Sequence, residues 1–230
     1  MFATIPPPPR RLLVFARLPL LGEVKSRLAE SIGKEKALAV YEAMLHDALA
    51  STGQTDATTE IEVLWAPTPA ANGAALRRAF GDRMPAMQTG PTLGDRLAMA
   101  FSERFFFQRS QKVIAIGVDE PTLTRETIDD AFGVLDACEW VVGPARDGGY
   151  YLIGSRGATF NADVFRDIEW GTESVLSATL ARIRQWKHTV AMLPERSDVD
   201  VLDDLRRFAV ENRDRPGALA NLVRAWGLAA

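Results

Sequence analysis

The sequence is poor in the residues that build disulfides and zinc sites. It contains one cysteine, Cys138, and two histidines, His46 and His188. A single cysteine cannot close a disulfide within the chain, and these residues are too few for the nitrogen and sulfur ligands of an ordinary structural zinc site. Any metal ion that the protein binds is therefore expected to have oxygen ligands.

Long apolar runs and blocks of basic residues are also absent. No run reaches the roughly 18 apolar residues that cross a membrane. The 27 lysines and arginines are outnumbered by 30 acids, and no basic block stands out, so we expect neither a membrane span nor a nucleic-acid-binding surface. Residues 1–9 lack the basic segment and apolar core of a secretory signal, and the protein is expected in the cytoplasm.

The composition fits one globular domain. A chain of 230 residues with 47% hydrophobic residues can bury one sizeable core, and no stretch has the composition of a linker. We expect a flexible proline-rich arm over residues 1–10 and a single domain over residues 11–230. The sequence does not indicate an oligomeric state.

A short apolar run that ends at two carboxylates is the most informative stretch of the chain. Residues 113–116 are followed closely by Asp119 and Glu120. Such a run predicts a strand buried on both faces in the middle of a mainly parallel sheet. Asp119 would lie at the sheet edge where ligands bind in open α/β folds, as a ligand for Mg²⁺ or Mn²⁺. Alternatively Asp119 only caps the next helix, although Thr124 can do so.

A second apolar run, Leu12–Ala16, predicts another central strand, and a basic loop follows it. This loop carries Arg17, Lys25 and Arg27. A loop in this position offers backbone N–H groups and cationic side chains to a phosphate chain. It lacks the Gly-Lys-Ser/Thr run of the P-loop and the spaced glycines of the dinucleotide fingerprint. The alternative is that its basic side chains are merely solvated.

Helices and strands alternate along the rest of the chain, as in a doubly wound α/β sheet. The predicted helices cover residues 34–50, 70–80, 93–105, 124–136 and 173–186, with further helices after residue 201. The remaining predicted strands cover residues 61–65, 84–88, 140–143, 150–153 and 189–193. Phe105, Phe106 and Phe107 are expected to pack in the core or against other helices.

Two glycine-containing stretches follow predicted strands. In the first, Gln88 stands close to Gly90 and Gly94, so its amide can meet a base edge while the backbone closes in. In the second, Asp147, Gly148 and Gly149 precede Tyr150 and Tyr151. This stretch offers a carboxylate, unshielded peptide groups and aromatic faces to a sugar or base. The alternative is an ordinary hairpin turn, which Asp-Gly makes well.

Acidic residues precede the last predicted helices. Asp198 and Asp200 are two apart in extended chain, and therefore on the same side, and either can complete a metal site with Asp119. Asp200 has an alternative role as a helix N-cap. Asp203 and Asp204 are expected to be structural, because acids in a first helical turn favour the helix dipole.

Several of these stretches recur together in a known family. They are Phe15-Ala-Arg, Gly22-Glu-Val-Lys-Ser-Arg-Leu, Leu93-Gly-Asp-Arg-Leu, Gly117-Val-Asp-Glu-Pro, Gly143-Pro-Ala-Arg-Asp-Gly-Gly-Tyr-Tyr-Leu-Ile-Gly and Asp198-Val-Asp. In order and spacing the sequence resembles the bacterial glycosyltransferase-like family of the domain of unknown function numbered 2064. That family is related to the 2-phospho-lactate and molybdenum-cofactor guanylyltransferases.

The resemblance implies the nucleotide-diphospho-sugar transferase (GT-A) fold, a three-layer α/β/α sandwich with a mainly parallel central sheet. It implies catalytic roles for Lys25, Arg27, Asp119 and Asp147. The nucleotide site it implies comprises Ala16, Arg17, Gly22, Lys25, Arg27, Gln88, Gly90 and Gly94. Asp147, Gly148, Gly149 and Tyr150 would face the second substrate, and Asp119 with Asp198 and Asp200 would hold Mg²⁺ or Mn²⁺. The sequence departs from the family pattern at Glu120 and Arg146.

The first functional interpretation is a Mg²⁺-dependent nucleotidyltransferase that moves a nucleotidyl group from a nucleoside triphosphate to a small phosphorylated or hydroxyl acceptor. Positioning and charge neutralisation suit a site of lysine, arginine and aspartate without a Ser-His or Cys-His pair. One alternative is a glycosyltransferase that uses a nucleotide-diphospho-sugar. Another is a non-catalytic nucleotide-binding protein.

Overall fold

The computed structural model describes residues 10–53, 58–83 and 85–228. The strands are β1 (Arg10–Ala16), β2 (Thr59–Trp65), β3 (Ala86–Met87), β4 (Lys112–Ile116), β5 (Trp140–Pro144), β6 (Tyr150–Arg156) and β7 (Val190–Met192). The helices are α1 (Ser26–Ile32), α2 (Lys34–Thr52), α3 (Gly73–Phe80), α4 (Leu93–Ser102), α5 (Arg125–Val134), α6 (Val175–Gln185), α7 (Leu202–Glu211) and α8 (Ala218–Ala225). Among the described residues, no helix is long and apolar enough to cross a membrane.

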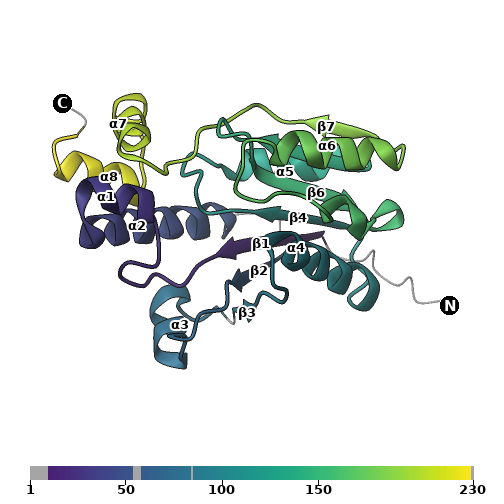
Figure 1. The fold of residues 1–230 in the computed structure, drawn as a ribbon, viewed down its shortest axis with the longest axis horizontal. Helices are drawn as coiled ribbons and strands as arrows, with labels where there is room; N and C mark the ends of the chain where they lie inside the picture. Colours follow the sequence, from purple (N-terminus) through teal and green to yellow (C-terminus); the bar gives the residue numbers. More distant parts are fainter. Residues whose placement is uncertain (1–9, 54–57, 84, 229–230) are drawn as a thin grey trace.

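The strands form one sheet in the order β3-β2-β1-β4-β6-β5-β7 (Figure 1). Only β6 runs antiparallel to its neighbours, β4 and β5, among the paired strands of the described chain. The two strands predicted to be central, β1 and β4, lie side by side near the middle. Leu12, Leu13, Val113 and Ile114 are fully buried, as continuous apolar runs predict for strands covered on both faces.

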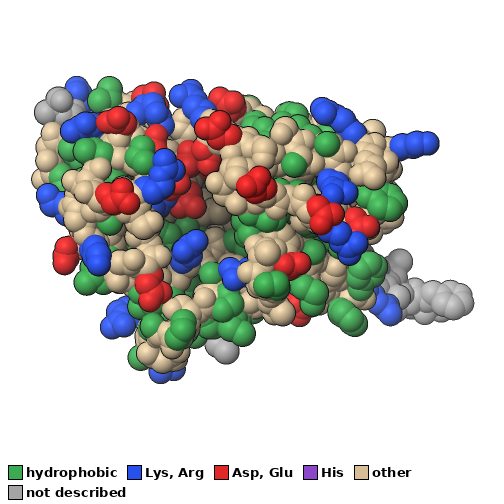
Figure 2. Space-filling view, in the orientation of Figure 1, with side chains coloured by type: hydrophobic (Ala, Val, Ile, Leu, Met, Phe, Trp, Pro, Cys, Tyr) green, Lys and Arg blue, Asp and Glu red, His purple; other side chains and the backbone are tan. Residues whose placement is uncertain are grey.

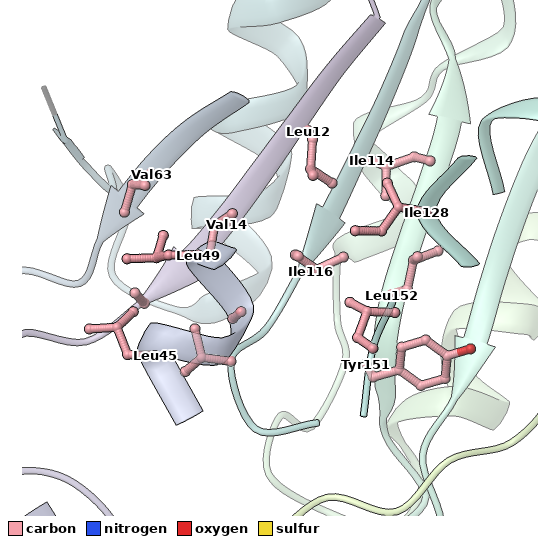
Figure 3. Packing of buried hydrophobic residues seen from close by; sticks show 14 of the residues in the cluster. Leu12, Val14, Leu45, Leu49, Val63, Ile114, Ile116, Ile128, Tyr151 and Leu152 are labelled. Atoms are coloured by element: carbon pink, nitrogen blue, oxygen red, sulfur yellow. The ribbon is translucent and has the colours of Figure 1, made fainter. Parts of the chain in front are cut away.

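Helices cover both faces of the sheet and make it the middle of three layers. On one face α2, α3 and α5 pack against β1 and β4, and Figure 3 shows Leu45 and Leu49 of α2 near Val14, with Ile128 of α5 near Ile114. On the other face α4 and α6 pack against the alternate side chains of the same strands. The predicted three-layer α/β/α sandwich is confirmed.

A separate group of helices lies beyond the C-terminal ends of β1 and β4 (Figure 1). Buried side chains of α1, α2, α7 and α8 form their own apolar cluster, which includes Leu28, Met44, Leu205 and Leu219. The carboxylate of Asp47 on α2 also accepts hydrogen bonds from the first N–H groups of α8. This cluster fixes the starts of α1 and α7, next to which Lys25 and Asp200 lie.

Several local predictions need correction. Arg10, expected in the arm, is the first residue of β1, while residues 1–9 and Met84, expected to begin a strand, lie outside the described residues. Arg27, expected in the loop after β1, lies in the first turn of α1. α4 ends at Ser102 and continues as a π-helical turn, Glu103–Phe107, which interrupts the 3.6-residue period. Phe105 is buried, but Phe106 and Phe107 are 68% and 82% exposed, so their predicted burial is wrong.

Candidate functional site

A pocket of about 450 Å³ lies at the C-terminal ends of β1 and β4, where the N-terminal end of the reversed strand β6 also arrives. Figure 2 shows this hollow with acidic side chains inside it and basic side chains around it. The predicted site residues that line it are Ala16, Arg17, Lys25, Arg27, Gln88, Asp119, Tyr150 and Asp200. These residues are far apart in the sequence, and the parallel sheet brings them together at one edge.

Lys25 lies at the centre of this arrangement. Its Nζ is 2.6 Å from Asp119 Oδ1 and 2.7 Å from Asp200 Oδ1, and its side chain is 3% exposed. The backbone of Lys25 is left-handed, with φ 48° and ψ 46°, immediately before α1. A non-glycine residue rarely adopts this conformation. Here the conformation turns the chain into α1 and places the ammonium group between the two carboxylates.

The charge on Lys25 is held firmly. Burial alone would lower its pKa, but the Asp119 and Asp200 carboxylates outweigh burial and leave the pKa above its ordinary value. Lys25 is therefore held in its protonated form between the two carboxyl groups. Asp119 and Asp200 keep 54% and 37% of their side chains exposed, so each has oxygen surface left for another ligand.

The first loop is anchored by Tyr41 of α2. The buried Tyr41 hydroxyl accepts a hydrogen bond from Arg17 N at 2.7 Å and donates one to Arg17 O at 3.0 Å. Burial raises the pKa of Tyr41, so the hydroxyl stays protonated and keeps donating. The Arg17 side chain is exposed at the pocket, and Arg27 Nη1 lies 4.0 Å from Asp200 Oδ2 with a 70% exposed side chain. Both guanidinium groups remain accessible to phosphate.

The two acidic segments are tied together through their backbones. Val199 N donates to Asp119 O at 3.0 Å. Asp204 Oδ2 accepts from Asp200 N and Val201 N, both at 3.0 Å, so Asp204 has the structural role predicted for it. Val201 is the N-cap residue of α7, and the alternative role of Asp200 as N-cap is wrong. The Asp200 side chain contacts Lys25 instead.

Asp198 lies in a different environment from Asp200. It lines a second cavity of about 290 Å³, together with Arg146 and Arg196, whereas Asp200 lines the main pocket. Asp198 and Asp200 were expected on the same side of an extended segment, but their side chains line different cavities. Burial, with the charges of Asp147 and Asp200, raises the pKa of Asp198 to about 6. Asp147 and Asp200 are thus close enough to Asp198 for their charges to affect it.

A buried polar network lies behind Asp119. Glu120 Oε1 accepts from the backbone N–H and hydroxyl of Thr122, while Oε2 is buried without a hydrogen-bond partner among the described residues, 3.7 Å from Arg196 Nη1. Burial raises the pKa of Glu120, against the opposing effects of Thr122 and Arg196. Arg196 donates to Thr122 O at 3.0 Å and to Thr127 Oγ1 at 2.9 Å. It thereby joins the turn after β4 to the segment before α7.

The carboxylates can supply part of a metal site. Within the described ranges, no group of three or more Asp, Glu, His and Cys residues is arranged to hold a metal ion. Mg²⁺ is commonly bound by one or two carboxylates together with substrate phosphates and water. Asp119 and Asp200 therefore fit a divalent ion that arrives with a nucleotide.

Gln88 and the glycines of the predicted nucleotide site mainly contact other parts of the protein. Gln88 is buried, and its Nε2 donates to Leu64 O at 2.7 Å and to Ala16 O at 3.4 Å, which leaves only its carbonyl oxygen for a ligand. A Cβ on Gly94 would come within 2.5 Å of Phe165 O, and neither Gly94 nor Phe165 lines the pocket. Gly22 and Gly90 have positive φ angles of 79° and 133° and do not line the pocket.

The Asp-Gly-Gly stretch forms the turn between β5 and β6, as its alternative interpretation predicts. Asp147 Oδ1 accepts from Gly149 N at 2.9 Å, and Gly148 has φ 87°. Tyr150 and Tyr151 belong to the apolar clusters on opposite faces of the sheet, and both line the main pocket. Tyr150 lines the pocket and packs against Trp170 at a ring distance of 6.2 Å.

Among the pocket residues that were not singled out from the sequence, Tyr41 and Arg96 make hydrogen bonds that shape the site. In the sequence, Tyr41 is indistinguishable from the other apolar-face residues of α2. Arg96 of α4 lines the same pocket as the first loop. Arg96 belongs to the stretch Leu93-Gly-Asp-Arg-Leu, and this motif was the available signal.

Comparisons with known proteins identify the family and the fold. The sequence matches the family described as "Uncharacterized protein conserved in bacteria (DUF2064)" over residues 49–172. The crystal structure of a "putative nucleotide-diphospho-sugar transferase" from Desulfovibrio desulfuricans G20 is similar to this chain with a TM-score of 0.90 and 31% sequence identity, over 96% of each chain. No curated protein matches the sequence.

More distant structures share the fold. Rv0371c from Mycobacterium tuberculosis H37Rv, in complex with manganese, has a TM-score of 0.51 and 16% identity over 86% of this chain and 97% of that chain. A cytidylyltransferase from Leptospira borgpetersenii has a TM-score of 0.56 and 9% identity over 95% of this chain and 93% of that chain. These similarities confirm the predicted nucleotide-diphospho-sugar transferase fold.

Proposed function

We propose, from the premise that this chain belongs to the DUF2064 family of bacterial proteins, that it is a transferase whose donor substrate is a nucleotide. The observation that carries this proposal is the juxtaposition of Lys25, Asp119 and Asp200 in the main pocket. The names of similar structures support the same class, because they include a nucleotide-diphospho-sugar transferase and a cytidylyltransferase.

Within this class, the reaction we propose is nucleotidyl transfer. An acceptor phosphate or hydroxyl attacks the α-phosphorus of a nucleoside triphosphate, the new P–O bond forms, and pyrophosphate leaves. Lys25 and Arg27 neutralise the phosphates, and Arg17 extends the same cationic surface. Tyr41 holds the loop backbone in place through both of its hydrogen bonds to Arg17. Asp147, with Gly148, Gly149 and Tyr150, would face the acceptor.

Asp119 and Asp200 would hold a divalent cation, Mg²⁺ or Mn²⁺, with Asp198 as a further candidate ligand. Such a cation, when bound, neutralises phosphate charge and orients the triphosphate. The structure similar to this chain that contains manganese is consistent with this assignment. Asp119 and Asp200 must then share their charge between the cation and Lys25, which leaves the ammonium group able to turn toward the phosphates.

A second candidate is glycosyl transfer from a nucleotide-diphospho-sugar. The 31% identity to a protein described as a nucleotide-diphospho-sugar transferase favours it. The same residues would bind a diphosphate rather than a triphosphate, and the bond that breaks would join the sugar to the diphosphate. Phosphate binding alone does not separate the two reactions, whereas the identity of the preferred donor does.

A thermal-shift panel tests the proposal. The four nucleoside triphosphates and common nucleotide sugars are each added with and without Mg²⁺. A ligand at about 100 times its dissociation constant stabilises the fold by roughly 2.7 kcal/mol, which the assay resolves. Mg²⁺-dependent shifts with a triphosphate support nucleotidyl transfer, and shifts confined to nucleotide sugars favour glycosyl transfer. No shift with any nucleotide would contradict both.

A further inference from the structure

Arg96 is a cation of the main pocket to which the proposed reaction assigns no role. It lies in the first turns of α4. Leu93 and Leu97 of the same helix also line the pocket. Lys25 and Arg27, in contrast, belong to the first loop and the start of α1. The pocket therefore carries positive charge on two walls built from different parts of the chain.

The position of the Arg96 guanidinium is fixed at one end. Its Nε donates to Gly90 O at 2.9 Å. This bond depends on the close approach of residue 90 to α4, where a Cβ on Gly90 would come within 2.7 Å of Asp95 Cβ and 3.0 Å of Arg96 N. The backbone of Gly90 has φ 133°, which a side chain disfavours. The chain before α4 is thus shaped to hold the base of the guanidinium group.

The other end of the same group has no protein partner. Within the described part of the chain, no carboxylate pairs with Arg96, and its terminal nitrogens make no hydrogen bond. The neighbouring acid, Asp95, is used elsewhere, since it completes the capping box of α4 with Thr92. Lys25, in contrast, already has two carboxylate partners. Arg96 is therefore a half-buried cation with its two terminal NH₂ groups available at the pocket.

We propose that Arg96 binds an oxyanion group, a phosphate, of a substrate of this pocket. A guanidinium fork donates two parallel hydrogen bonds to such a group, and fixing Nε in advance reduces the orientational freedom lost on binding. This inference rests on the proposed function only in taking the substrates to be a nucleotide and a second substrate. The oxyanion belongs either to the nucleotide or to the second substrate, and each source gives a different experimental result.

The test uses three variants of the full chain. Arg96→Gln removes the charge and the fork, and Arg96→Lys keeps the charge but loses the fork. Arg77→Gln is the control, because it removes the same charge from an exposed position on α3 outside the pocket. Unfolding midpoints of the ligand-free proteins establish that each variant folds. If Arg96→Gln fails to fold, Arg96→Lys carries the test.

Calorimetric titrations measure the binding affinities in two sets of experiments, or arms. In the first, nucleoside mono-, di- and triphosphates are titrated with Mg²⁺ present. In the second, inorganic phosphate and pyrophosphate are titrated into the protein alone and into the protein saturated with nucleotide. Loss of a charge-assisted pair of hydrogen bonds predicts binding weakened about 10-fold to 100-fold in Arg96→Gln. Weakening in the first arm identifies the nucleotide as the source, and weakening confined to the second identifies the second substrate.

Unchanged affinities in both arms, within about twofold of Arg77→Gln, would overturn the role of Arg96. Arg96-dependent binding of phosphate or pyrophosphate by a protein that binds no nucleotide would keep this role and reject the proposed function. A wild-type protein that binds neither nucleotide nor either inorganic anion would reject both.

Discussion

Lys25 combines a left-handed backbone, a buried ammonium group and two carboxylate partners. The conformation costs about 1–2 kcal/mol in a residue with a side chain. Hydrogen bonds to charged groups contribute about 1.5–3 kcal/mol each, and exposure of Asp119 and Asp200 reduces that figure. The two bonds together still offset the strain. Without ligand, the Lys25 ammonium group thus holds Asp119 and Asp200 together. When a nucleotide binds, a divalent ion would take over part of this role at the carboxylates, and the phosphates would take over part of it at Lys25.

This arrangement predicts an increase in metal affinity when Lys25 is removed. In Lys25→Met, a divalent ion no longer competes with the ammonium group for Asp119 and Asp200. At about 1 kcal/mol per pair of unit charges in water-like surroundings, removing the repulsion between Lys25 and a doubly charged ion is worth about 2 kcal/mol, so Mn²⁺ alone should bind roughly 30-fold more tightly. Triphosphate binding should weaken, because a phosphate partner is lost. Electron paramagnetic resonance of free Mn²⁺ and nucleotide titrations measure the two effects.

Lys34→Met is the control for this change. Lys34 is exposed beside the same loop, close to Gly22, and contacts neither acid. If Lys25→Met and Lys34→Met bind Mn²⁺ equally, Lys25 does not compete with the metal. Weaker Mn²⁺ binding in Lys25→Met would show that the lysine orders the two carboxylates instead.

Some residue roles were readable from the sequence and others were not. The position of Asp119 after a buried apolar run placed it at the ligand edge of the sheet, and Thr124 caps α5 as expected. The bond from Gln88 to Leu64 could not be predicted, because it depends on the pairing of strands remote in the sequence. The same holds for Arg96, whose bond to Gly90 depends on a local turn with no strong sequence signature.

At the level of elements, apolar runs predicted β1 and β4 well because both strands are covered on two faces. The Asp-Gly hairpin turn, the alternative interpretation of its stretch, reverses the chain into β6, and the insertion of β6 between β4 and β5 is set by long-range pairing. Helix α1 escaped prediction because Lys25 precedes it without a side-chain cap, and only Leu28 of its residues is buried.

Packing of α4 predicts a structural cost for Gly94→Ala. The added methyl group would lie about 2.5 Å from Phe165 O and 2.6 Å from Trp170 Nε1. Overpacking of this kind typically costs about 1–3 kcal/mol. We expect a lower midpoint in urea unfolding and, since α4 carries Arg96, weaker ligand binding.

Gly133→Ala in α5 is the matched control for Gly94→Ala. A Cβ on Gly133 has no atom within 4 Å, so alanine should stabilise this helix by up to about 1 kcal/mol. Unchanged stability of Gly94→Ala together with impaired nucleotide binding would favour a direct role for Gly94 at the base, as the family resemblance implies.

At the scale of the whole molecule, a partly buried group of charged residues away from the pocket joins the sheet to the segment after α4. Arg104 Nη2 lies 2.5 Å from Glu62 Oε2, and Arg11 Nη1 lies 2.6 Å from Glu62 Oε1. The Arg104 side chain is only 4% exposed. Burial would raise the pKa of Glu62, but Arg104 and Arg11 outweigh it and hold the pKa below its ordinary value.

Glu62→Gln should therefore lower the free energy of unfolding at pH 7 by about 1.5–3 kcal/mol, because Arg104 and Arg11 both lose a charged partner, although Arg104 keeps Glu103 and Arg11 keeps Glu60. A depressed carboxyl pKa stabilises the fold above the unfolded pKa and loses that effect as the pH falls through the folded pKa. The difference between wild type and variant should shrink below about pH 4.5. Urea unfolding between pH 3 and 7 measures it.

Glu60→Gln provides the comparison on the same strand. Glu60 pairs with Arg11 at 2.7 Å but is 54% exposed, so its loss should cost no more than about 1 kcal/mol. Equal destabilisation by Glu60→Gln and Glu62→Gln would contradict the importance assigned to burial. A pH-independent gap for Glu62→Gln would contradict the assigned direction of the pKa shift.

The site as a whole arises from topology. Lys25, Asp119 and Asp200 meet because parallel strands end at one edge and because the α1, α2, α7 and α8 cluster fixes the adjoining loops. The sequence located each residue after a strand or before a helix, but not its contacts. The sequence did not show whether Asp198 or Asp200 contacts Lys25, because this depends on the backbone path that places Asp198 at a second cavity.

The most direct test of this account is a calorimetric titration of the preferred nucleoside triphosphate, with and without Mg²⁺, into wild type and Asp119→Asn. Asp203→Asn, an exposed substitution in α7, is the control. Wild type and Asp203→Asn should bind at least about 10-fold more tightly with Mg²⁺, and Asp119→Asn should lose that difference while remaining folded. Undiminished Mg²⁺ dependence in Asp119→Asn would contradict the assignment of Asp119 and the site built around it.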